Sequence, residues 1–343
     1  MPLTRTLAFA ALAAAFVAGP ATAQQSVADF YKGKNVALLL GTGPGGSYDL
    51  YARIFAEFLS KHIPGNPNIV VEHMPGAGGV TAGNHLFGPG PQDGTKVLLS
   101  HAIILSEMLS PKGVRFKSSE LNWVGTYDAI NHTLAVWHEA GAKSLDDLKG
   151  DKGAKFTMGS FARAHLTYQW PAMFKEVMGL NYRLITGYPT GNHNNLAMER
   201  GEIHGWAASW ENLIGTRPHW IKEKKVYLPV QFVLERKPEI PDVPTFIEIA
   251  PADKKDMVEF MTAATPFGRA IVLGPKVPAE RVAALRTAFA ATVKDPGFLA
   301  MAKKRQVDVH WRDHNETMAL VKKIVSASPA LLSRVKKSIG QEE

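Results

Sequence analysis

A glycine-rich turn is the first feature of this sequence whose residue types could do chemistry. Residues 41–49 read GTGPGGSYD, follow a strand-like apolar run at 36–40 and lead into a helix-like segment at 47–62. Glycines let the backbone approach a ligand closely, and free N–H groups at the start of a helix attract anions. We therefore expect an anionic ligand here, the alternative being a plain strand-to-helix turn capped by Ser47 or Asp49. The candidate binding residues are Pro44, Gly45, Gly46, Ser47, Tyr48 and Asp49.

A second glycine-rich turn follows the next strand-like run along the chain. Residues 71–79 read VEHMPGAGG and again lead into a helix-like segment, which we expect over residues 77–86. If the strands are parallel, both turns lie at the carboxyl ends of neighbouring strands, the edge where ligands of open α/β sheets gather. This adds Gly76 and Ala77 to the candidate binding residues.

The start of the chain predicts export. Arg5 is the only charged residue before residue 24, residues 7–18 are almost wholly apolar, and Ala21-Thr22-Ala23 forms a small-x-small site. These features are typical of a secretory signal peptide, and the apolar run is shorter than the roughly 20 residues that span a bilayer. We predict a signal peptide over residues 1–23, cleavage after Ala23, and a mature protein in the periplasm.

Composition and missing motifs exclude several kinds of function. The chain has no cysteine, which rules out disulfides, thiolate catalysis and Cys-ligated zinc. Its formal net charge of +8 comes from scattered residues, so we expect a mild attraction for anions and no nucleic-acid partner. His310 and His314 have the spacing of a helical metal pair but lack an evident third ligand, so no metal is predicted. G-x-S-x-G and H-E-x-x-H motifs are missing, which argues against an enzyme.

The first turn also matches the dinucleotide fingerprint G-x-G-x-x-G, with Glu72 near the expected position of a ribose-binding acid. Pro44 removes one amide from such a phosphate cradle, and Asp49 would repel a pyrophosphate. The predicted export also takes the chain to a compartment where NAD is scarce. We therefore expect no dinucleotide and no other cofactor.

Strand-like and helix-like segments alternate along the mature chain. Apolar residues of 47–62 recur at helical spacing, and residues 68–72 and 96–100 are strand-like, which predicts a β-α-β-α-β unit with a parallel sheet. A second unit follows. Its predicted strands are 155–159, 182–186 and 226–232 and its helices are 164–178 and 192–200, after which come a strand at 268–273 and a helix at 278–293. The fold class is therefore α/β, with two units in series.

Four motifs in order resemble one family of receptors. Residues 44–49 with Ala52-Arg53 resemble the opening motif of the tripartite tricarboxylate transporter substrate-binding proteins, also called the Bug family. Residues 71–79 resemble the family's second motif, Asp93-Gly94 the third, and residues 241–245, PDVPT, the fourth. Together they extend over nearly the whole mature chain.

The resemblance implies a two-lobed periplasmic binding protein fold of the type II kind, with a mainly parallel sheet flanked by helices in each lobe and the ligand in the cleft between them. It implies a first lobe of residues 24–125 plus 240–343 and a second lobe of residues 126–239. It also implies a monomer without catalytic activity that binds a small organic acid and docks on the permease subunits of a tripartite tricarboxylate transporter. The ligand class stays open between a dicarboxylate and an aromatic acid.

The resemblance further implies that two later loops face the first glycine-rich turn. One is the turn after the strand at 155–159, and the other opens the helix at 192–200. Their candidate binding residues are Gly159, Ser160, Phe161, Arg163, His165, Tyr188, Thr190, Gly191 and Asn192.

Several of these residues depart from the family's pattern and leave two interpretations open. Arg163 either forms a bidentate pair with a carboxylate or is a solvated arginine at a helix start. Trp206 and Trp210, with Phe161 and Tyr188, either stack on an aromatic or long apolar ligand or pack in the core. Trp210 completes the candidate binding residues.

The predicted function is a periplasmic receptor that delivers a small carboxylate to a membrane transporter. One alternative is a sensory co-receptor of the same fold that signals to a membrane sensor kinase. A second alternative is an exported hydrolase, which the missing nucleophile motifs disfavour.

Overall fold

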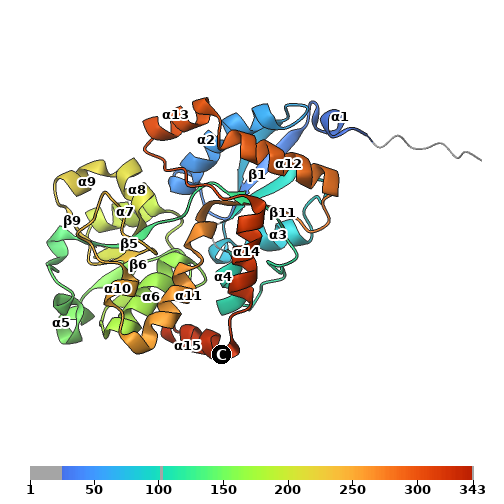
Figure 1. Ribbon diagram of the computed structural model, residues 1–343. Helices are drawn as coiled ribbons and strands as arrows, with labels where there is room; N and C mark the ends of the chain where they lie inside the picture. The colour runs from blue at the N-terminus through green and yellow to red at the C-terminus, as the bar shows by residue number, and fades with distance from the viewer. Residues whose placement is uncertain (1–24, 101–102, 342–343) are drawn as a thin grey trace, which may run out of the picture.

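The chain folds around two β-sheets with helices packed on their faces (Figure 1). The structure is a computed structural model that describes residues 25–100 and 103–341. The predicted signal peptide and the cleavage site after Ala23 lie outside the described residues. Among the described helices, none is long and apolar enough to cross a membrane.

The first sheet has the strand order β2-β1-β3-β11-β4. β1 pairs in parallel with β2 and β3, which confirms the parallel unit predicted from the sequence. β11 runs antiparallel between β3 and β4, so the strand after residue 268 returns to the first sheet. The bounds are β1 (Asn35–Leu40), β2 (Asn68–His73), β3 (Lys96–Ser100), β4 (Asn122–Thr126) and β11 (Ala270–Leu273).

Helices cover both faces of this sheet, which explains why its inner strands are apolar on both sides. Residues 36–40 of β1 are all buried, as expected of a strand between two parallel neighbours. α12 and α13 pack against α2, and α14 packs against β4 and α4. The helix bounds are α1 (Val27–Tyr31), α2 (Ser47–His62), α3 (Val80–Phe87), α4 (Ile103–Leu109), α12 (Ala279–Thr292), α13 (Pro296–Lys304) and α14 (His314–Val325).

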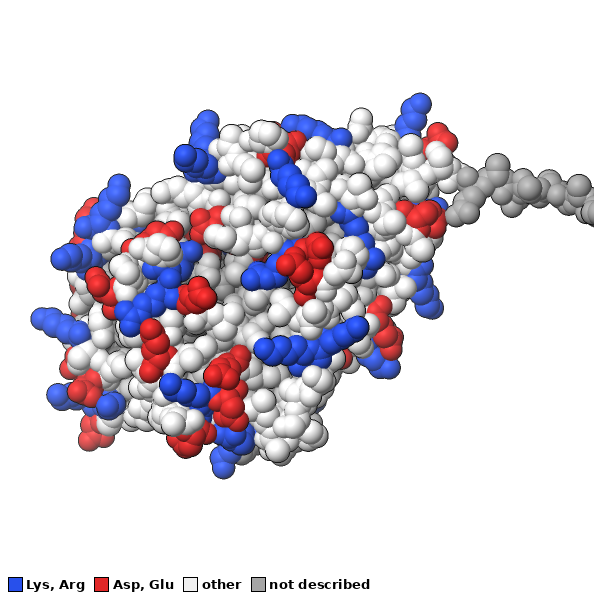
Figure 2. Space-filling model, in the orientation of Figure 1, with Lys and Arg blue, Asp and Glu red and all other residues white. Residues whose placement is uncertain are grey.

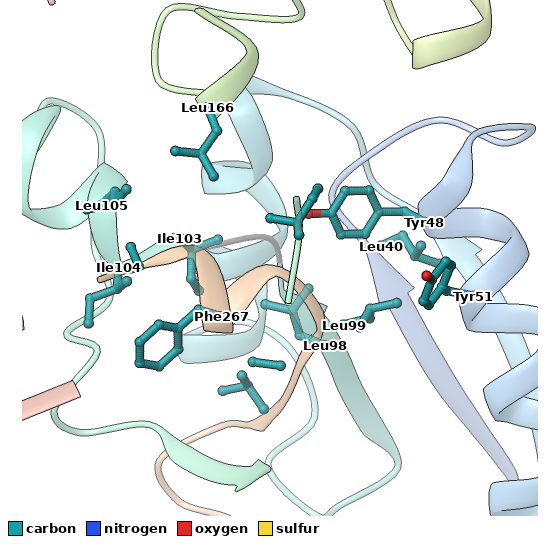
Figure 3. Packing of buried hydrophobic residues seen from close by; sticks show 14 of the residues in the cluster. Leu40, Tyr48, Tyr51, Leu98, Leu99, Ile103, Ile104, Leu105, Leu166 and Phe267 are labelled. Carbon is teal, nitrogen blue, oxygen red and sulfur yellow. The ribbon is translucent and has the colours of Figure 1, made fainter. Parts of the chain in front are cut away.

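α2 carries the first glycine-rich turn at its N-terminus and is fixed to the sheet by a continuous apolar face. Figure 3 shows Tyr48 and Tyr51 of α2 beside Leu40 at the end of β1, with Leu98 and Leu99 of β3 below them. Burial of this face holds the start of α2 at the carboxyl edge of the sheet.

The second sheet has the order β10-β5-β8-β6-β7, with β9 also paired to β5. β6 is parallel to β7 and β8, whereas β5 is antiparallel to β8, β9 and β10, so the sheet is mixed around a parallel core. The strands are β5 (His132–Trp137), β6 (Thr157–Gly159), β7 (Arg183–Ile185), β8 (Gly205–Ser209), β9 (Val226–Tyr227) and β10 (Gln231–Phe232). The helices around it are α5 (Gly150–Ala154), α6 (Leu166–Met178), α7 (Gly191–Glu199), α8 (Trp210–Thr216) and α9 (Pro218–Lys222).

Two predicted elements differ from the structure for backbone reasons. The single strand predicted over 226–232 is wrong, because residues 228–230 interrupt it and Pro229 has no N–H to donate to a ladder. The helix predicted from residue 77 begins instead as a 3₁₀ turn, Ala77–Gly79, because Gly78 and Gly79 adopt φ of 65° and 93°. The regular helix α3 starts only at Val80.

The C-terminal third of the chain contacts both sheets. α10 (Phe246–Ile249) places Phe246 against Phe174 of α6 and Phe232 of β10. α11 (Lys255–Thr262) packs on α15 (Pro329–Ser338), which also lies against α6 and α4 (Figure 1). The predicted division assigns α10, α11 and α15 to the first lobe, although α10 contacts β10 and α6 and α15 contacts α6.

The chain crosses between the sheets through a tight backbone contact at Gly268. A Cβ built on Gly268 would lie 2.4 Å from Cβ of Ile130 and 2.5 Å from its backbone nitrogen. Gly268→Ala should therefore lower the free energy of unfolding by about 1–3 kcal/mol, the usual cost of overpacking. Chemical denaturation measures the change. Gly215→Ala is the control, because that exposed glycine of α8 has only Leu50 Cδ2 nearby, at 3.9 Å. Equal stability of the two variants would contradict the prediction.

Candidate functional site

A cavity lies between the carboxyl edges of the two sheets. The hollow has about 370 Å³ of empty space when its opening to solvent is included, and a cavity volume of about 20 Å³. A buried water needs roughly 10–15 Å³ by this measure, so the cavity has room for about one water as it stands. The lining residues are Thr42, Gly43, Gly46, Ser47, Tyr48, Ile130, His132, Phe161, His165, Thr167, Thr190, Gly191, Trp206, Ser209 and Asn212.

The turn between β1 and α2 forms the first wall. Its last residue, Gly46, is the N-cap of α2, and no side chain caps the first amides of that helix. Gly45 adopts φ of 84°, a left-handed conformation that favours glycine. The turn therefore presents main-chain N–H groups and the positive end of the α2 dipole to the cavity.

Asp49 holds this turn in place from outside the cavity. Its Oδ2 accepts hydrogen bonds from Gly45 N at 3.2 Å and Arg53 Nε at 3.1 Å, and His73 Nε2 lies 3.1 Å from Oδ1. Burial acts to raise the pKa of Asp49, but the bonds from Arg53 and Gly45 and the charge of Arg53 together lower it below its usual value. Asp49 is therefore an ionised brace whose charge is balanced by Arg53.

Asp49→Ala should destabilise the protein by about 1–2 kcal/mol at neutral pH, since it removes charge-assisted bonds between a buried carboxylate and the exposed Arg53. The folded pKa lies below the unfolded value of about 4, so this contribution is present above pH 4 and disappears as pH falls through the folded pKa. Urea unfolding of both proteins at pH 7 and pH 3 tests this. Glu57→Ala, an exposed change in the same helix, is the control. A pH-independent difference would contradict the brace.

The start of α7 forms the opposite wall. Its N-cap is Thr190, again with no side chain on the first amides of the helix. The wall is tight at Gly191, where a Cβ would meet Asn212 Nδ2 at 2.7 Å and Trp206 Cη2 at 2.9 Å. A glycine here brings the α7 amides close to the side chains that follow β8.

Contacts between the walls keep the cavity closed. Asn192 Nδ2 donates to Gly45 O, and Ser47 Oγ lies 3.5 Å from Ser209 Oγ. A Cβ on Gly43 would lie 3.3 Å from Thr190 Cγ2. A ligand larger than water therefore needs the two walls to part before it can enter.

Aromatic rings form one side of the cavity. The rings of Phe161 and Trp206 lie 6.0 Å apart at an interplanar angle of 31°, and Phe161 lies 4.6 Å from the His165 ring. Ile130 and Tyr48 add further apolar surface. This side suits a flat apolar group.

Among the residues that the structure describes, the polar groups of the cavity include no carboxylate, ammonium or guanidinium group. Burial, and secondarily the Arg269 charge, lower the pKa of His132 to about 3, so this imidazole is uncharged at physiological pH. Any charge brought by a ligand would meet only dipoles and hydrogen-bond donors or acceptors.

The lowered pKa of His132 predicts a pH dependence of stability. The unfolded histidine binds a proton near pH 6.5 and the folded one only near pH 3, so stability falls as pH drops from 6.5 toward 3. The slope is at most about 1.4 kcal/mol per pH unit. His132→Gln should flatten the fall in unfolding free energy between pH 6.5 and 5, measured by urea denaturation. His138→Gln, at an exposed position, should leave the slope unchanged, and an unchanged slope in His132→Gln would refute the prediction.

Some of the sequence-predicted binding residues line the cavity. They come from three of the four predicted loops and include the N-caps Gly46 and Thr190 and the residues that follow them. They are Gly46, Ser47, Tyr48, Phe161, His165, Thr190 and Gly191.

The other candidates lie beside or away from the cavity. Ser160 Oγ donates to Ile185 O, Gly159 packs under Asn194, and Asn192 bonds across to Gly45. Those that do not line the cavity are Pro44, Gly45, Asp49, Gly76, Ala77, Gly159, Ser160, Arg163, Tyr188, Asn192 and Trp210.

Arg163 is exposed and lines a separate hollow with Lys112 and Lys336. Its guanidinium lies 5.8 Å from the Tyr168 ring, and its backbone oxygen accepts from Gln341. Trp210 is buried at the start of α8 outside the cavity, whereas Trp206 lines it.

Sequence reasoning missed a group of cavity residues around β5 and β8. Ser209 and Asn212 follow β8 as the predicted loops follow their strands, and this repetition was the available signal. The cavity residues outside the predicted set are Thr42, Gly43, Ile130, His132, Thr167, Trp206, Ser209 and Asn212.

Comparison with known proteins gives one fold. No family model matches the chain. A curated relative, "UPF0065 protein in gbd 5'region" of Cupriavidus necator, is 23% identical and the match covers 96% of this chain and 95% of that protein. The structure of the periplasmic binding protein BugD superposes with a TM-score of 0.70 at 20% identity, covering 91% of this chain and 99% of that one.

Two ligand-bound structures from Rhodopseudomonas palustris are also similar. MatC with bound malate has a TM-score of 0.68 at 16% identity, covering 89% of this chain and 99% of its own. A protein solved with adipate has a TM-score of 0.69 at 17% identity, and the match covers 90% of this chain and 97% of that one. The fold is therefore that of a two-lobed periplasmic binding protein, and the cavity lies where its two lobes meet. The resemblance to the Bug proteins that the motifs indicated is confirmed by these similarities.

Proposed function

We propose that this chain is a periplasmic solute-binding receptor that holds a small carboxylate between its two lobes. The observation that carries the proposal is the pair of helix starts, at Gly46 and Thr190, that face each other across the cavity without side-chain caps. A Cβ on Gly46 would lie 4.0 Å from Gly191 N, so the two sets of amides are close together. Helix N-termini favour anions through their free N–H groups and dipoles.

A second observation supports the same ligand class. Asn212 is 2% exposed, and its Nδ2 beside Gly191 has no hydrogen-bond partner among the residues that the structure describes. A buried donor without a partner costs free energy, so a ligand acceptor at this position would be rewarded. An ionised carboxylate offers acceptors and no donors, which matches this set of groups.

The similar structures solved with malate and adipate support a carboxylate as well. Charge on the outer surface fits this picture only weakly. Figure 2 shows basic and acidic side chains interspersed over the visible face, so any attraction of anions comes from the overall charge of +8.

The transport cycle follows from opening and closing. We infer a first lobe of about residues 24–125 plus 240–343 and a second of 126–239, with export by the signal peptide and cleavage after Ala23. A ligand that contacts both helix starts favours the closed form, and the permease subunits of a tripartite tricarboxylate-type transporter then recognise that form. The same closed form in a sensory co-receptor would signal to a kinase instead.

Thermal-shift measurements with matched acids and amides test the proposal. Malate, adipate, benzoate and phenylacetate are each compared with the corresponding amide, because main-chain donors reward negative charge. At a hundredfold excess over Kd, a bound acid should add about 2.7 kcal/mol to the unfolding free energy. Mass spectrometry of small molecules that copurify with the protein identifies the natural ligand. Amides that stabilise as well as acids would refute carboxylate recognition.

Two variants test where the ligand binds. Gly191→Ala should weaken acid binding at least tenfold, because its Cβ would enter the space between Asn212 and Trp206. Arg163→Ala should change affinity less than twofold, since that side chain is exposed outside the cavity. Titration calorimetry with the best acid of the panel decides. A strong loss in Arg163→Ala would instead support the bidentate pair.

A further inference from the structure

Three buried side chains at one wall of the cavity, Trp206, Asn195 and Asn212, are joined by hydrogen bonds into a relay. Trp206 Nε1 donates to Asn195 Oδ1 at 3.1 Å, and Asn195 Nδ2 donates to Asn212 Oδ1 at 2.9 Å. The exposed fractions are 2% for Trp206, 0% for Asn195 and 2% for Asn212. Trp206 and Asn212 line the cavity, whereas Asn195 stands behind them on α7.

The indole at one end fixes the direction of this relay. An indole N–H can only donate, so the Asn195 atom that faces Trp206 must be the amide oxygen. The Asn195 amide nitrogen then faces Asn212, whose oxygen must turn toward it. The orientation of each amide therefore follows from the chemistry of its neighbour.

Thr216 favours the same direction. Its Oγ1 donates to Asn212 O at 2.7 Å, which commits the hydroxyl proton, and Asn195 Nδ2 lies 3.2 Å from the same oxygen. With its proton committed, Thr216 can only accept from Asn195. An Asn195 side chain turned the other way would set its oxygen against two acceptors, Asn212 Oδ1 and Thr216 Oγ1.

The relay leaves one possible orientation for Asn212. Its oxygen is turned to Asn195, so its Nδ2 is directed to the cavity beside Gly191 at the start of α7. Asn212 Nδ2 and the main-chain N–H groups at the helix starts are all hydrogen-bond donors. A ligand group that binds between them must therefore accept hydrogen bonds on both of its sides. An amide ligand satisfies one side with its oxygen and sets its NH₂ against donors on the other, whereas a carboxylate satisfies both.

We propose that Asn195 is a positioning residue that fixes the hydrogen-bond polarity of Asn212 and thereby makes the site select a carboxylate on a flat apolar body over the matching amide. The flat body follows from the same relay, because the bond to Asn195 holds the Trp206 ring beside Phe161 as the aromatic side of the cavity. This inference rests on the proposed function and names the ligand class of that site.

The decisive variant is Asn195→Asp, with benzoate and benzamide as probes of equal shape. A carboxylate at this position only accepts, so it still bonds to Trp206, but Asn212 must turn its Nδ2 inward and its oxygen to the cavity. Titration calorimetry should show at least a tenfold preference for benzoate in the unaltered protein. In Asn195→Asp benzoate should bind at least tenfold more weakly, and benzamide should bind more tightly than to the unaltered protein.

Asn194→Asp is the matched control for added charge. Asn194 is the adjacent fully buried residue of α7, and its Nδ2 donates to Thr190 O outside the relay. Charge repulsion alone would weaken the binding of benzoate in both variants and would not strengthen the binding of benzamide in either. The same benzoate-to-benzamide ratio in Asn195→Asp as in Asn194→Asp would overturn the relay.

A second pair of variants applies if circular dichroism shows that Asn195→Asp is unfolded. Trp206→Phe keeps an aromatic ring but removes one of the two groups that set the direction of Asn195, the other being Thr216, so the preference for benzoate should fall at least threefold. Trp220→Phe makes the same change at a buried indole of the same core that does not line the cavity, and should keep the preference. Equal ratios in the two Trp variants would overturn the relay.

The outcomes separate this inference from the proposed function. If the unaltered protein prefers benzoate and Asn195→Asp keeps that preference, the relay is wrong and carboxylate binding stands. If malate or adipate stabilises the protein and benzoate does not, the flat apolar body is wrong. If none of the acids stabilises it, the proposed function itself fails.

Discussion

The buried guanidinium of Arg269 is the contact on which the arrangement of the two lobes depends. Arg269 is fully buried at the end of the 3₁₀ turn Thr265–Arg269, just before β11 of the first sheet. Its guanidinium carbon lies 3.6 Å from the centre of the Tyr51 ring in α2, and Nη2 lies 3.9 Å from Glu211 Oε2 in α8. Nη1 donates to Ala129 O at 3.3 Å, in the segment that crosses between the sheets. A buried charge whose partners move away is strongly unfavourable, so Arg269 holds α2, α8 and the crossing segment around one point.

The same cluster explains how an uncharged His132 can line the cavity beside buried charges. Burial raises the pKa of Asp128 and of Glu211, and the nearby Arg269 charge opposes that rise. Both acids have hydrogen-bond partners away from the cavity, since Asp128 accepts from Tyr51 and Glu211 accepts from Asn131. Tyr48 and His132 stand at the cavity surface, and the Arg269 charge helps to keep His132 neutral. An anion that enters therefore meets oriented dipoles rather than a fixed opposite charge. Under the proposed function, such a site would hold its ligand through geometry and would release it when the lobes part.

The sequence predicted the features that depend on local backbone chemistry. The turn before α2 was predictable because its glycines, the apolar run before it and the amphipathic helix after it all point to one strand-turn-helix unit. The cavity residues from β5 and β8 were not, because His132, Ser209 and Asn212 come together only through the antiparallel pairing of β5 with β8 and the packing of α7 on β8. Neither pairing leaves a periodic signal in one chain. Arg163 is a residue that the sequence suggested wrongly for the cavity. Its position in a predicted loop favoured a binding role, but its side chain lines a different hollow.

Closure is the property that joins these observations. The walls already meet through Asn192 and Gly45, and the cavity between them has room for about one water, so closure does not require a ligand to fill a large void. A ligand changes the balance between open and closed forms only by its differential contacts with the two. The start of α2 belongs to one side and the start of α7 to the other, so a group that accepts from both binds the closed form better than either lobe alone. An apolar body without such a group contacts Phe161 and Trp206, which both come from the second sheet's side, and it gains little from closure. In the proposed receptor, the polar head of the ligand would therefore drive closure, and the aromatic side of the cavity would select which ligands carry that head.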